Sequence, residues 1–466
     1  MKAVCWIRRD LRLSDHAALA AATERADQVV VAFVFDRNIL DALEDRDDRR
    51  VTFIHRSLVE LDAKLRARGS NLVVLHGNPL EEIPKLAAAF GADLVVAGRD
   101  YEPYAIQRDQ DVAERLKATG IEFQSVKDTV IFEGGEIFGQ SGLPLRVYTP
   151  YSKVWRKQFE LGDHAAEHTP DLTKLVAYPA ATDWSMDALG FAANDLWVSA
   201  GEDAGLAQLE AYSHKVDGYA KDRDFPALAA TSGLSVHLRF GTVSIRACVR
   251  MALERGGHGA DKWLAELIWR DFYQDILSHN PRVVREPFNP TYRGLEYPGD
   301  ESHYQAWEQG LTGYPIVDAA MRCFNATGWM HNRLRMVVAS FLTKDLLVDY
   351  RRGEAYFARK LLDFDLASNN GGWQWAASVG CDAQPYFRIF NPRLQSLKFD
   401  PDGVFIREWI PEIAGLQGEH LHTPTLASAF DLASAGVELG KTYPLPIVDH
   451  MVQKERAIQL LGSVGT

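Results

Sequence analysis

The chain has 466 residues, a net charge of −12 and an apolar fraction of 47%, values typical of a globular protein with two or three domains. No stretch approaches the roughly 20 unbroken apolar residues of a membrane-spanning helix. The N-terminal MKAVCWIRRDLRL carries charges where a signal peptide needs an apolar run. We therefore expect a cytoplasmic protein with no membrane partner. Its acidic balance excludes general nucleic-acid binding unless a local basic patch exists.

Four cysteines lie far apart in the chain and form no C-x-x-C pair, and the histidines are scattered without H-E-x-x-H spacing. This pattern disfavours a metal site or a redox dithiol. We expect no bound metal, and buried free thiols at Cys5, Cys248, Cys323 and Cys381.

The N-terminal part, residues 1–132, alternates short Val-rich runs with amphipathic stretches of helical length, which predicts a doubly wound parallel-sheet α/β domain. It has no G-x-G-x-x-G or G-x-x-x-x-G-K-[ST] loop, so a standard dinucleotide or ATP site is not indicated. The expected strands are Ala3–Ile7, Val29–Phe35, Leu72–His76 and Leu94–Ala97, and the expected helices include Val51–Ala67 and Tyr104–Thr119.

Residues 133–200 are turn-rich with little periodicity, which predicts a long connector between domains. Residues 201–466 follow a helical pattern. One helix is expected after Gly313, with Pro315 at its start, and another from about Met330 to Leu347. The predicted fold is thus an α/β domain joined to an all-α domain.

One predicted helix, Trp263–Ile276, carries a mixed polar and aromatic face. Glu266, Trp269, Arg270 and Tyr273 fall at i, i+3, i+4 and i+7 and share that face. The plainer interpretation is a solvated face with a Glu–Arg pair. A large tryptophan there is unusual and favours a binding surface.

Two further stretches place polar groups together. In WMHNRLRM, Asn332, Arg333 and Met336 share a helix face, while Arg335 points elsewhere. In TSGLS, residues 231–235, three hydroxyls surround a glycine and suit either a simple N-cap or a phosphate.

The stretch NNGGWQWAAS sets Trp373 and Trp375 behind a predicted flexible Asn-Gly-Gly turn. Asp363 and Asp365 precede it, and such a pair could bind a metal, hold a ribose or pair with arginines. Tryptophans interleaved with arginines suit base stacking and phosphate neutralisation. The arginines that could form the basic patch are Arg223, Arg270, Arg333 and Arg388.

Taken in order, TSGLS, ELIWRDFY, TGYPIVDAAMR, GWMHNRLRM, DFDLASNNGGWQW and PYFRIFNP resemble the photolyase/cryptochrome family, as does the N-terminal WIRRDLRLSDHAAL. The resemblance covers nearly the whole chain and is greatest to class I cyclobutane pyrimidine dimer photolyases. It implies a helical domain that holds FAD, active in its reduced form. It also implies blue-light repair of UV-damaged DNA by electron transfer to a flipped-out dimer, by a monomer.

The resemblance also assigns residues to the flavin. Asn369 would lie at the flavin N5, and Asp363 would pair with Arg335. The full flavin set is Tyr219, Thr231, Ser232, Gly233, Leu234, Ser235, Arg270, Asn332, Arg335, Asp363, Asp365 and Asn369.

On the DNA side, the resemblance implies that Glu266 hydrogen-bonds the dimer base and stabilises its developing charge, with Met336 in contact with the dimer. Trp269, Tyr273 and Trp375 would contact the flipped dimer. The backbone would be gripped by Arg223, Arg333 and Arg388.

The chain departs from the family pattern in its electron relay. Trp373 matches the first of the usual three tryptophans, but Tyr350 and Tyr297 stand at the second and third places. Either tyrosyl radicals carry the relay, or another aromatic substitutes, or photoreduction is slow; simple packing is the plainer interpretation of both tyrosines.

The resemblance allows a second, antenna chromophore, but Tyr104 and Ala105 replace the Asn-Glu pair of folate binders, so its identity stays open. A blue-light photoreceptor without repair activity is the main alternative function. Asn369, Glu266 and the short stretch after YPLPIVDHMVQKERAIQLL argue against it. Asn332 and Met336, where (6-4) photolyases have histidines, favour the cyclobutane dimer. A binding module that stacks single strands on its aromatic side chains is a third alternative.

Overall fold

The structure is a computed structural model that describes residues 1–179 and 183–464. It divides into two compact units, considered separately here. The first unit comprises Met1–Asp217 and Ser232–Pro281, and the second comprises Gly218–Thr231 and Arg282–Thr466. The domain boundaries expected at residues 132 and 200 stay predictions. Among the described residues, no helix is both long and apolar enough to cross a membrane.

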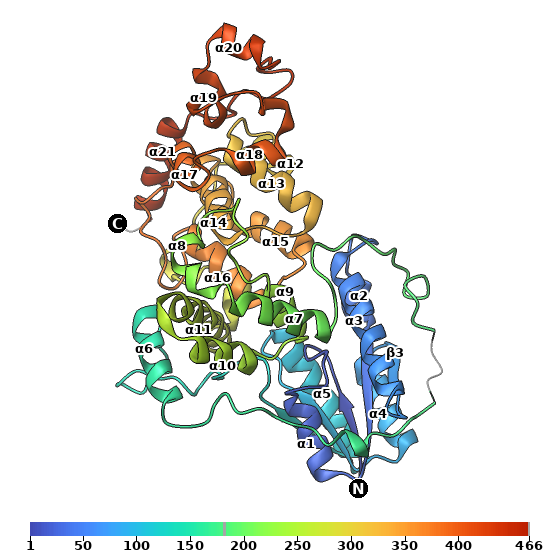
Figure 1. Ribbon diagram of the computed structural model, residues 1–466. Coiled ribbons are helices and arrows are strands. Elements are labelled where there is room, and N and C mark those ends of the chain that lie inside the picture. Colours follow the sequence, from blue (N-terminus) through green and yellow to red (C-terminus); the bar gives the residue numbers. More distant parts are fainter. Residues whose placement is uncertain (180–182, 465–466) are drawn as a thin grey trace. The chain divides into compact units, whose positions relative to one another are not determined.

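The first unit contains a parallel sheet, as the sequence predicts, with its strand β3 labelled in Figure 1. The sheet has five strands in the order β3-β2-β1-β4-β5. The four expected strands occur within a residue of their predicted ends. The fifth strand escaped prediction because EFQSV lacks an apolar run and lies at the sheet edge, where burial is incomplete. The strands are β1 Lys2–Trp6, β2 Gln28–Asp36, β3 Leu72–Gly77, β4 Leu94–Gly98 and β5 Glu122–Val126.

Helices cover both faces of this sheet. Helices α4 and α5 pack on one face, where Val4 and Trp6 of β1 meet Ile83 of α4 and Leu116 of α5. Right-handed crossovers in this strand order place α1 and α3 on the other face. The helices of this part are α1 Ala17–Arg25, α2 Arg37–Leu40, α3 Arg49–Arg66, α4 Pro79–Phe90 and α5 Pro103–Ala118.

The first unit also contains helices outside the sheet layers. The segment 133–200, predicted as a connector, contains the helix α6, which buries Tyr151 and Trp155 and was not predicted. These two aromatics lie four apart and give the helix a narrow apolar stripe, a signal that the turn-rich surroundings hid. The helices are α6 Tyr148–Phe159, α7 Glu202–Ser213, α9 Ser235–Phe240, α10 Ile245–Arg255 and α11 Gly257–His279.

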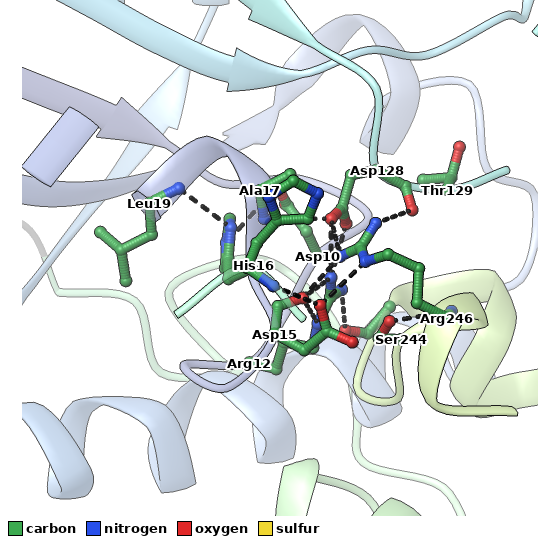
Figure 2. A network of polar contacts seen from close by, with 12 residues as sticks. Asp10, Arg12, Asp15, His16, Ala17, Leu19, Asp128, Thr129, Ser244 and Arg246 are labelled. Carbon is green, nitrogen blue, oxygen red and sulfur yellow. Dashed lines mark hydrogen bonds and ion pairs between the residues drawn. The ribbon is translucent and has the colours of Figure 1, made fainter. Parts of the chain in front are cut away.

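A buried ionic cluster fastens α10 to the sheet (Figure 2). We call Arg12, Asp15, Asp128 and Arg246 the Arg246 network. Arg246 donates to Asp15 and Asp128 at 2.8 Å each, and Arg12 donates to both oxygens of Asp128 at 2.8 Å. Burial alone would raise the pKa of Asp128, but the two guanidiniums lower it far below its usual value. The network therefore stays ionised and fixes α10, against which α11 packs.

The second unit is helical among its described residues, as the sequence predicts for this half of the chain. Its core includes Trp307, Phe324, Phe341 and Trp373. The helix expected at Pro315 is confirmed. Its helices are α8 Tyr219–Asp222, α12 Glu301–Gln309, α13 Pro315–Thr327, α14 Asn332–Ser340, α15 Tyr350–Lys360, α16 Leu366–Ala376, α17 Pro392–Phe399, α18 Val404–Trp409, α19 Glu419–His422, α20 Ala429–Ser434 and α21 His450–Gly462.

The helix expected from Met330 to Leu347 is present with a change of winding. After α14 the backbone continues as a π-helix, Phe341–Asp345. Short π-helical turns are rare and frequent at functional sites. This turn places Lys344 and Asp345, both with no exposed side-chain surface, inside the unit.

Candidate functional site

The first part of the candidate site is one face of α11 in the first unit, here called the α11 face: Glu266, Trp269, Arg270 and Tyr273. All four are half-buried, whereas the opposite side of the helix is buried. The amphipathic helix predicted over Trp263–Ile276 is therefore confirmed. Arg270 donates to the backbone carbonyl of Thr129.

Trp269 stacks on Tyr148, a residue that the sequence did not single out. The ring centroids are 3.7 Å apart and the planes differ by 5°. The Tyr148 hydroxyl donates to the Ala265 carbonyl at 2.7 Å, which holds that ring against α11. Burial raises the pKa of Tyr148 to about 12, and Glu266 contributes to the rise. Trp269 is thus a rigid platform beside a carboxylate, backed by a second aromatic ring.

The loop at residues 231–235 leads into α9, which begins at Ser235. Leu234 is the N-cap residue and, among the described residues, no side chain caps the helix, so the simple N-cap interpretation is wrong. Gly233 has φ +66°, a left-handed conformation that favours glycine. The Ser232 hydroxyl accepts from the Leu234 amide at 3.3 Å, and the Ser232 carbonyl accepts from Gln208 at 2.6 Å. Leu234 is buried and Ser235 is exposed. Thr231 is the last residue of one segment of the second unit, and Ser232 is the first residue of the following segment of the first unit.

In the second unit, α14 presents its polar residues in two directions. Arg335 donates to both oxygens of Asp363, at 2.8 and 3.1 Å, and to the Met330 carbonyl at 2.8 Å. The expected Arg335–Asp363 pair is therefore present. Asn332 is exposed and Met336 is half-buried.

The predicted Asn-Gly-Gly turn is wrong, because residues 369–372 lie inside α16. Asp365 caps the helix and accepts from the Ser368 amide at 3.0 Å. Asn370 and Gln374 donate to the Val283 carbonyl at 2.9 and 3.0 Å and hold the helix from its other side. These contacts outweigh the poor helix propensity of two glycines.

One side of α16, here called the α16 face, consists of Asp365, Asn369 and Gly372. The Asn369 side-chain NH₂ donates to the Glu354 carbonyl at 3.2 Å, so its Oδ1 is the polar atom left for a ligand. A Cβ on Gly372 would meet nothing within 4 Å. The α16 face therefore places the Oδ1 acceptor of Asn369 next to open space at Gly372, where no side chain covers the helix backbone.

The two tryptophans of α16 lie in different surroundings. Trp373 is buried and packs so tightly on Gly353 that a Cβ there would lie 2.1 Å from its ring. Its ring neighbours are Phe357 at 5.0 Å and Trp307 at 6.1 Å. Trp375 is half-buried.

The two relay tyrosines are also partly or fully enclosed. Tyr350 is buried and Tyr297 is half-buried. Burial raises the pKa of both phenols well above the usual value, and each hydroxyl lacks a hydrogen-bond partner among the described residues. Burial is the main cause of the raised pKa at Tyr297, and the charges of Asp349 and Tyr350 add to it.

Two of the four candidate arginines meet in the second unit. Arg333 donates to Asp224 at 2.9 Å and lies over the Phe399 ring at 4.4 Å. Arg223 is 3.9 Å from Asp224 and lies over the Tyr219 ring at 5.1 Å. Arg388 is exposed in the segment between α16 and α17. Arg270 belongs to the α11 face of the first unit.

Comparison with known proteins gives these features a family. Residues 3–172 match the DNA photolyase model, and residues 263–463 match the FAD binding domain of DNA photolyase. The α16 face fits such a cofactor, because a flat ring can approach the helix backbone at Gly372 while Asn369 offers Oδ1. In the same unit, Arg335, held by Asp363, adds a cation for polar parts of a nucleotide.

The relatives cover almost the whole chain. A protein of Synechococcus sp. named deoxyribodipyrimidine photo-lyase is 39% identical over 97% of this chain and 94% of its own. Its counterpart in Agrobacterium fabrum is 38% identical over 99% and 98%. The crystal structure of a bacterial class III photolyase from Agrobacterium tumefaciens aligns with a TM-score of 0.92 and 36% identity, covering 100% and 98% of the two chains. A cryptochrome of Synechocystis sp. aligns with a TM-score of 0.87 and 28% identity, covering 98% and 99%. The chain belongs to the DNA photolyase family.

Proposed function

We propose that this protein repairs cyclobutane pyrimidine dimers in DNA under blue light, with reduced FAD as its cofactor. Relatives that carry the name deoxyribodipyrimidine photo-lyase match it over nearly its full length. The structural observation that carries the proposal is the α16 face, where Asn369 presents an acceptor atom beside open space.

When bound, reduced FAD supplies the light-excited electron that opens the cyclobutane ring and then takes the electron back. Asn369 is the residue assigned to the flavin N5. Its NH₂ donates to the Glu354 carbonyl, and with the amide held this way its Oδ1 would accept the N5–H of a reduced flavin. Asp363 keeps Arg335 in place on the same unit.

On α11, Glu266 and Trp269 have complementary roles toward the dimer. The indole, backed by Tyr148, provides a flat apolar surface for a base that has left the duplex stack. Each base–aromatic stack contributes roughly 1–3 kcal/mol. Glu266 hydrogen-bonds the base and stabilises the charge that develops on it. Tyr273 extends this aromatic surface.

In the second unit, Trp375 and Met336 are assigned to the dimer, and three arginines to the DNA backbone. Arg223 and Arg333 both lie beside Asp224, which holds the two guanidiniums close together for phosphate oxygens. Arg388 is exposed for the same purpose. Such contacts supply a basic patch that the net charge of −12 conceals.

The relay through Trp373, Tyr350 and Tyr297 stays a prediction. So do an antenna chromophore, class I membership, the monomeric state and the cytoplasmic location. A structure of an archaeal photolyase from Sulfolobus tokodaii with two FAD molecules has a TM-score of 0.84 and 32% identity to this chain. The second FAD of that archaeal protein is described as implying a light-harvesting cofactor there, which supports a second chromophore here.

Expression in a bacterial strain without photolyase tests the proposal. We expect cells that carry this chain to survive UV irradiation better when blue light follows than when darkness follows. A flavin-containing protein that leaves survival equal in light and darkness would instead favour the photoreceptor function. A purified protein without flavin would favour a nucleic-acid binding module.

A further inference from the structure

The side chain of Lys344 occupies an unusual place in the second unit. It has no exposed surface, and it reaches the segment 377–391, which joins α16 to α17 without regular secondary structure. Its Nζ donates to the Ser378 hydroxyl at 2.7 Å and lies 3.4 Å from the Arg388 carbonyl oxygen. A buried ammonium is costly unless its donors are satisfied, and these two acceptors are both neutral.

The acceptors of Lys344 lie next to two residues assigned to DNA. The Ser378 amide donates to the Trp375 carbonyl at 3.2 Å, and the Gln384 amide donates to that same oxygen at 3.4 Å. The Gln384 side chain also donates to the Arg388 carbonyl. The Lys344 network is therefore Lys344, Ser378, Gln384 and the carbonyl oxygens of Trp375 and Arg388. It connects the backbone of a dimer-stacking residue to the backbone of a phosphate-binding residue.

Two backbone features show that this connection is specific. Ser378 has φ +65°, a conformation that few residues other than glycine adopt, and its hydroxyl faces Lys344. Lys344 lies in the π-helix Phe341–Asp345, whose winding sets where its side chain points. Among the described residues, the ion pair of the neighbouring Asp345 is with His450 at 2.5 Å, so Asp345 interacts with Lys344 only through its charge. Lys344 is thus committed to the segment 377–391.

We propose that Lys344 is a positioning residue for damage recognition, holding Trp375 and Arg388 in one fixed spacing from beneath the DNA-binding segment. This inference rests on the proposed function. A flipped dimer must meet Trp375 while the backbone next to it meets Arg388, so the spacing between the two decides how well a lesion fits. An undamaged duplex flips no base, so its binding uses Arg388 but does not depend on the spacing between Trp375 and Arg388.

The test compares the purified flavoprotein with its Lys344→Met variant. Fluorescence anisotropy in darkness measures the affinity for a labelled duplex with a single thymine dimer and for the same duplex without it. We expect Lys344→Met to lower the affinity for the damaged duplex roughly 10-fold while affinity for the undamaged duplex changes little. Flavin content and thermal unfolding of each protein show whether the fold is kept.

Thr343→Val is the matched control, because Thr343 lies in the same π-helix. Among the described residues it donates to carbonyls of its own helix alone, Ala339 at 2.8 Å and Ser340 at 3.5 Å. It should bind both duplexes as the unchanged protein does. Ser378→Ala removes the acceptor of Lys344 and should reproduce the loss. Combined with Lys344→Met it should add little, because the two residues act as one unit.

The possible outcomes distinguish the positioning role of Lys344 from the proposed function. An unchanged preference for the damaged duplex in Lys344→Met overturns the positioning role and leaves the proposed function intact. If Lys344→Met does not fold, Ser378→Ala decides in its place, with a loss supporting the role and an unchanged preference overturning it. No preference for damage in the unchanged protein overturns the proposed function together with this inference.

Discussion

Buried charged side chains have different hydrogen-bond partners in the two compact units. In the first unit, the Arg246 network sets two guanidiniums against two carboxylates, and the pKa of Asp128 falls far below its usual value despite burial. In the second unit, Lys344 has neutral oxygens as acceptors, and burial lowers its pKa to about 8. A matched network holds its charge and fastens helices together. Lys344 has only neutral acceptors, so its charge is stabilised less than the charges of the Arg246 network, and its contacts are better explained by positioning than by stability.

The same rule applies within the first unit, on the buried side of α11. Burial raises the pKa of Asp271 to about 6 and that of Asp275 to about 7, although hydrogen-bond donors oppose the rise in both cases. Among the ion pairs of the described residues, no arginine pairs with Asp271 or Asp275 as Arg12 and Arg246 pair with Asp128. The pairing of charge, rather than membership of a unit, thus sets how each buried group titrates.

Asp128→Asn should produce the largest loss of stability. It leaves Arg12 and Arg246 buried with an uncompensated charge, which costs about 3–5 kcal/mol of the unfolding free energy. Chemical denaturation measures this loss. The control is Glu122→Gln, which removes a solvent-exposed ion pair with Arg25 and should change little. Equal effects of the two substitutions would contradict the role given to the network.

Asp275→Asn should stabilise the protein at neutral and alkaline pH. The pKa of Asp275 is 3.8 ordinarily and about 7 in the fold, so the native state binds more protons than the unfolded chain between these values. Its contribution to stability is present below about pH 4 and is lost as pH rises to about 7. The substitution should remove this loss, raising stability at pH 8 by about 2 kcal/mol.

Unfolding curves from pH 4 to 8 measure the effect of Asp275→Asn. The control, Asp261→Asn, lies on the same helix with a largely exposed carboxylate paired to Arg156. It should keep the slope of the unchanged protein. A flat profile in the unchanged protein would show that Asp275 does not titrate in this window.

Lys344→Met should change the unfolding free energy by no more than about 1 kcal/mol, because an apolar side chain of similar length replaces a buried charge whose acceptors are both neutral. Asp345 keeps its contact with His450. Chemical denaturation of the Lys344→Met and Asp128→Asn variants, measured together, compares the unfolding free energy lost in the two networks. A loss as large as that of Asp128→Asn would make Lys344 a structural fastener.

Glu266→Ala should have the smallest effect on stability and a clear effect on function. Its half-buried position on α11 has no core role, so flavin content and DNA affinity should be largely kept. The repair yield per absorbed photon should fall several-fold, since the charge on the dimer base loses its hydrogen bond. An unchanged yield would remove Glu266 from the mechanism.

Hydrophobic periodicity in the sequence predicted many of the strands and helices. The Val-rich strands and the amphipathic α11 follow directly from spacing, because each buries one repeating face. The Arg335–Asp363 pair and Asn369 came instead from motif resemblance, since no spacing rule joins residues that distant in the chain. β5 lacked an apolar run and α6 was hidden among turns, so both were missed.

The remaining features depend on tertiary contacts. Two glycines suggested a turn at residues 371–372, yet Asn370 and Gln374 hold α16 helical through the Val283 carbonyl. Tyr148 meets Trp269 only because α6 packs against α11. The π-helix that directs Lys344 has no sequence signature, because local propensity does not distinguish it from an α-helix.

The most direct test of the account is a count of dimers. The purified protein, kept reduced, is mixed with an oligonucleotide that carries one thymine dimer and is then split between blue light and darkness. The account predicts that intact thymines reappear in the light and that the dark sample is unchanged. Dimers that persist in the light, with reduced flavin bound and the DNA occupied, would contradict it.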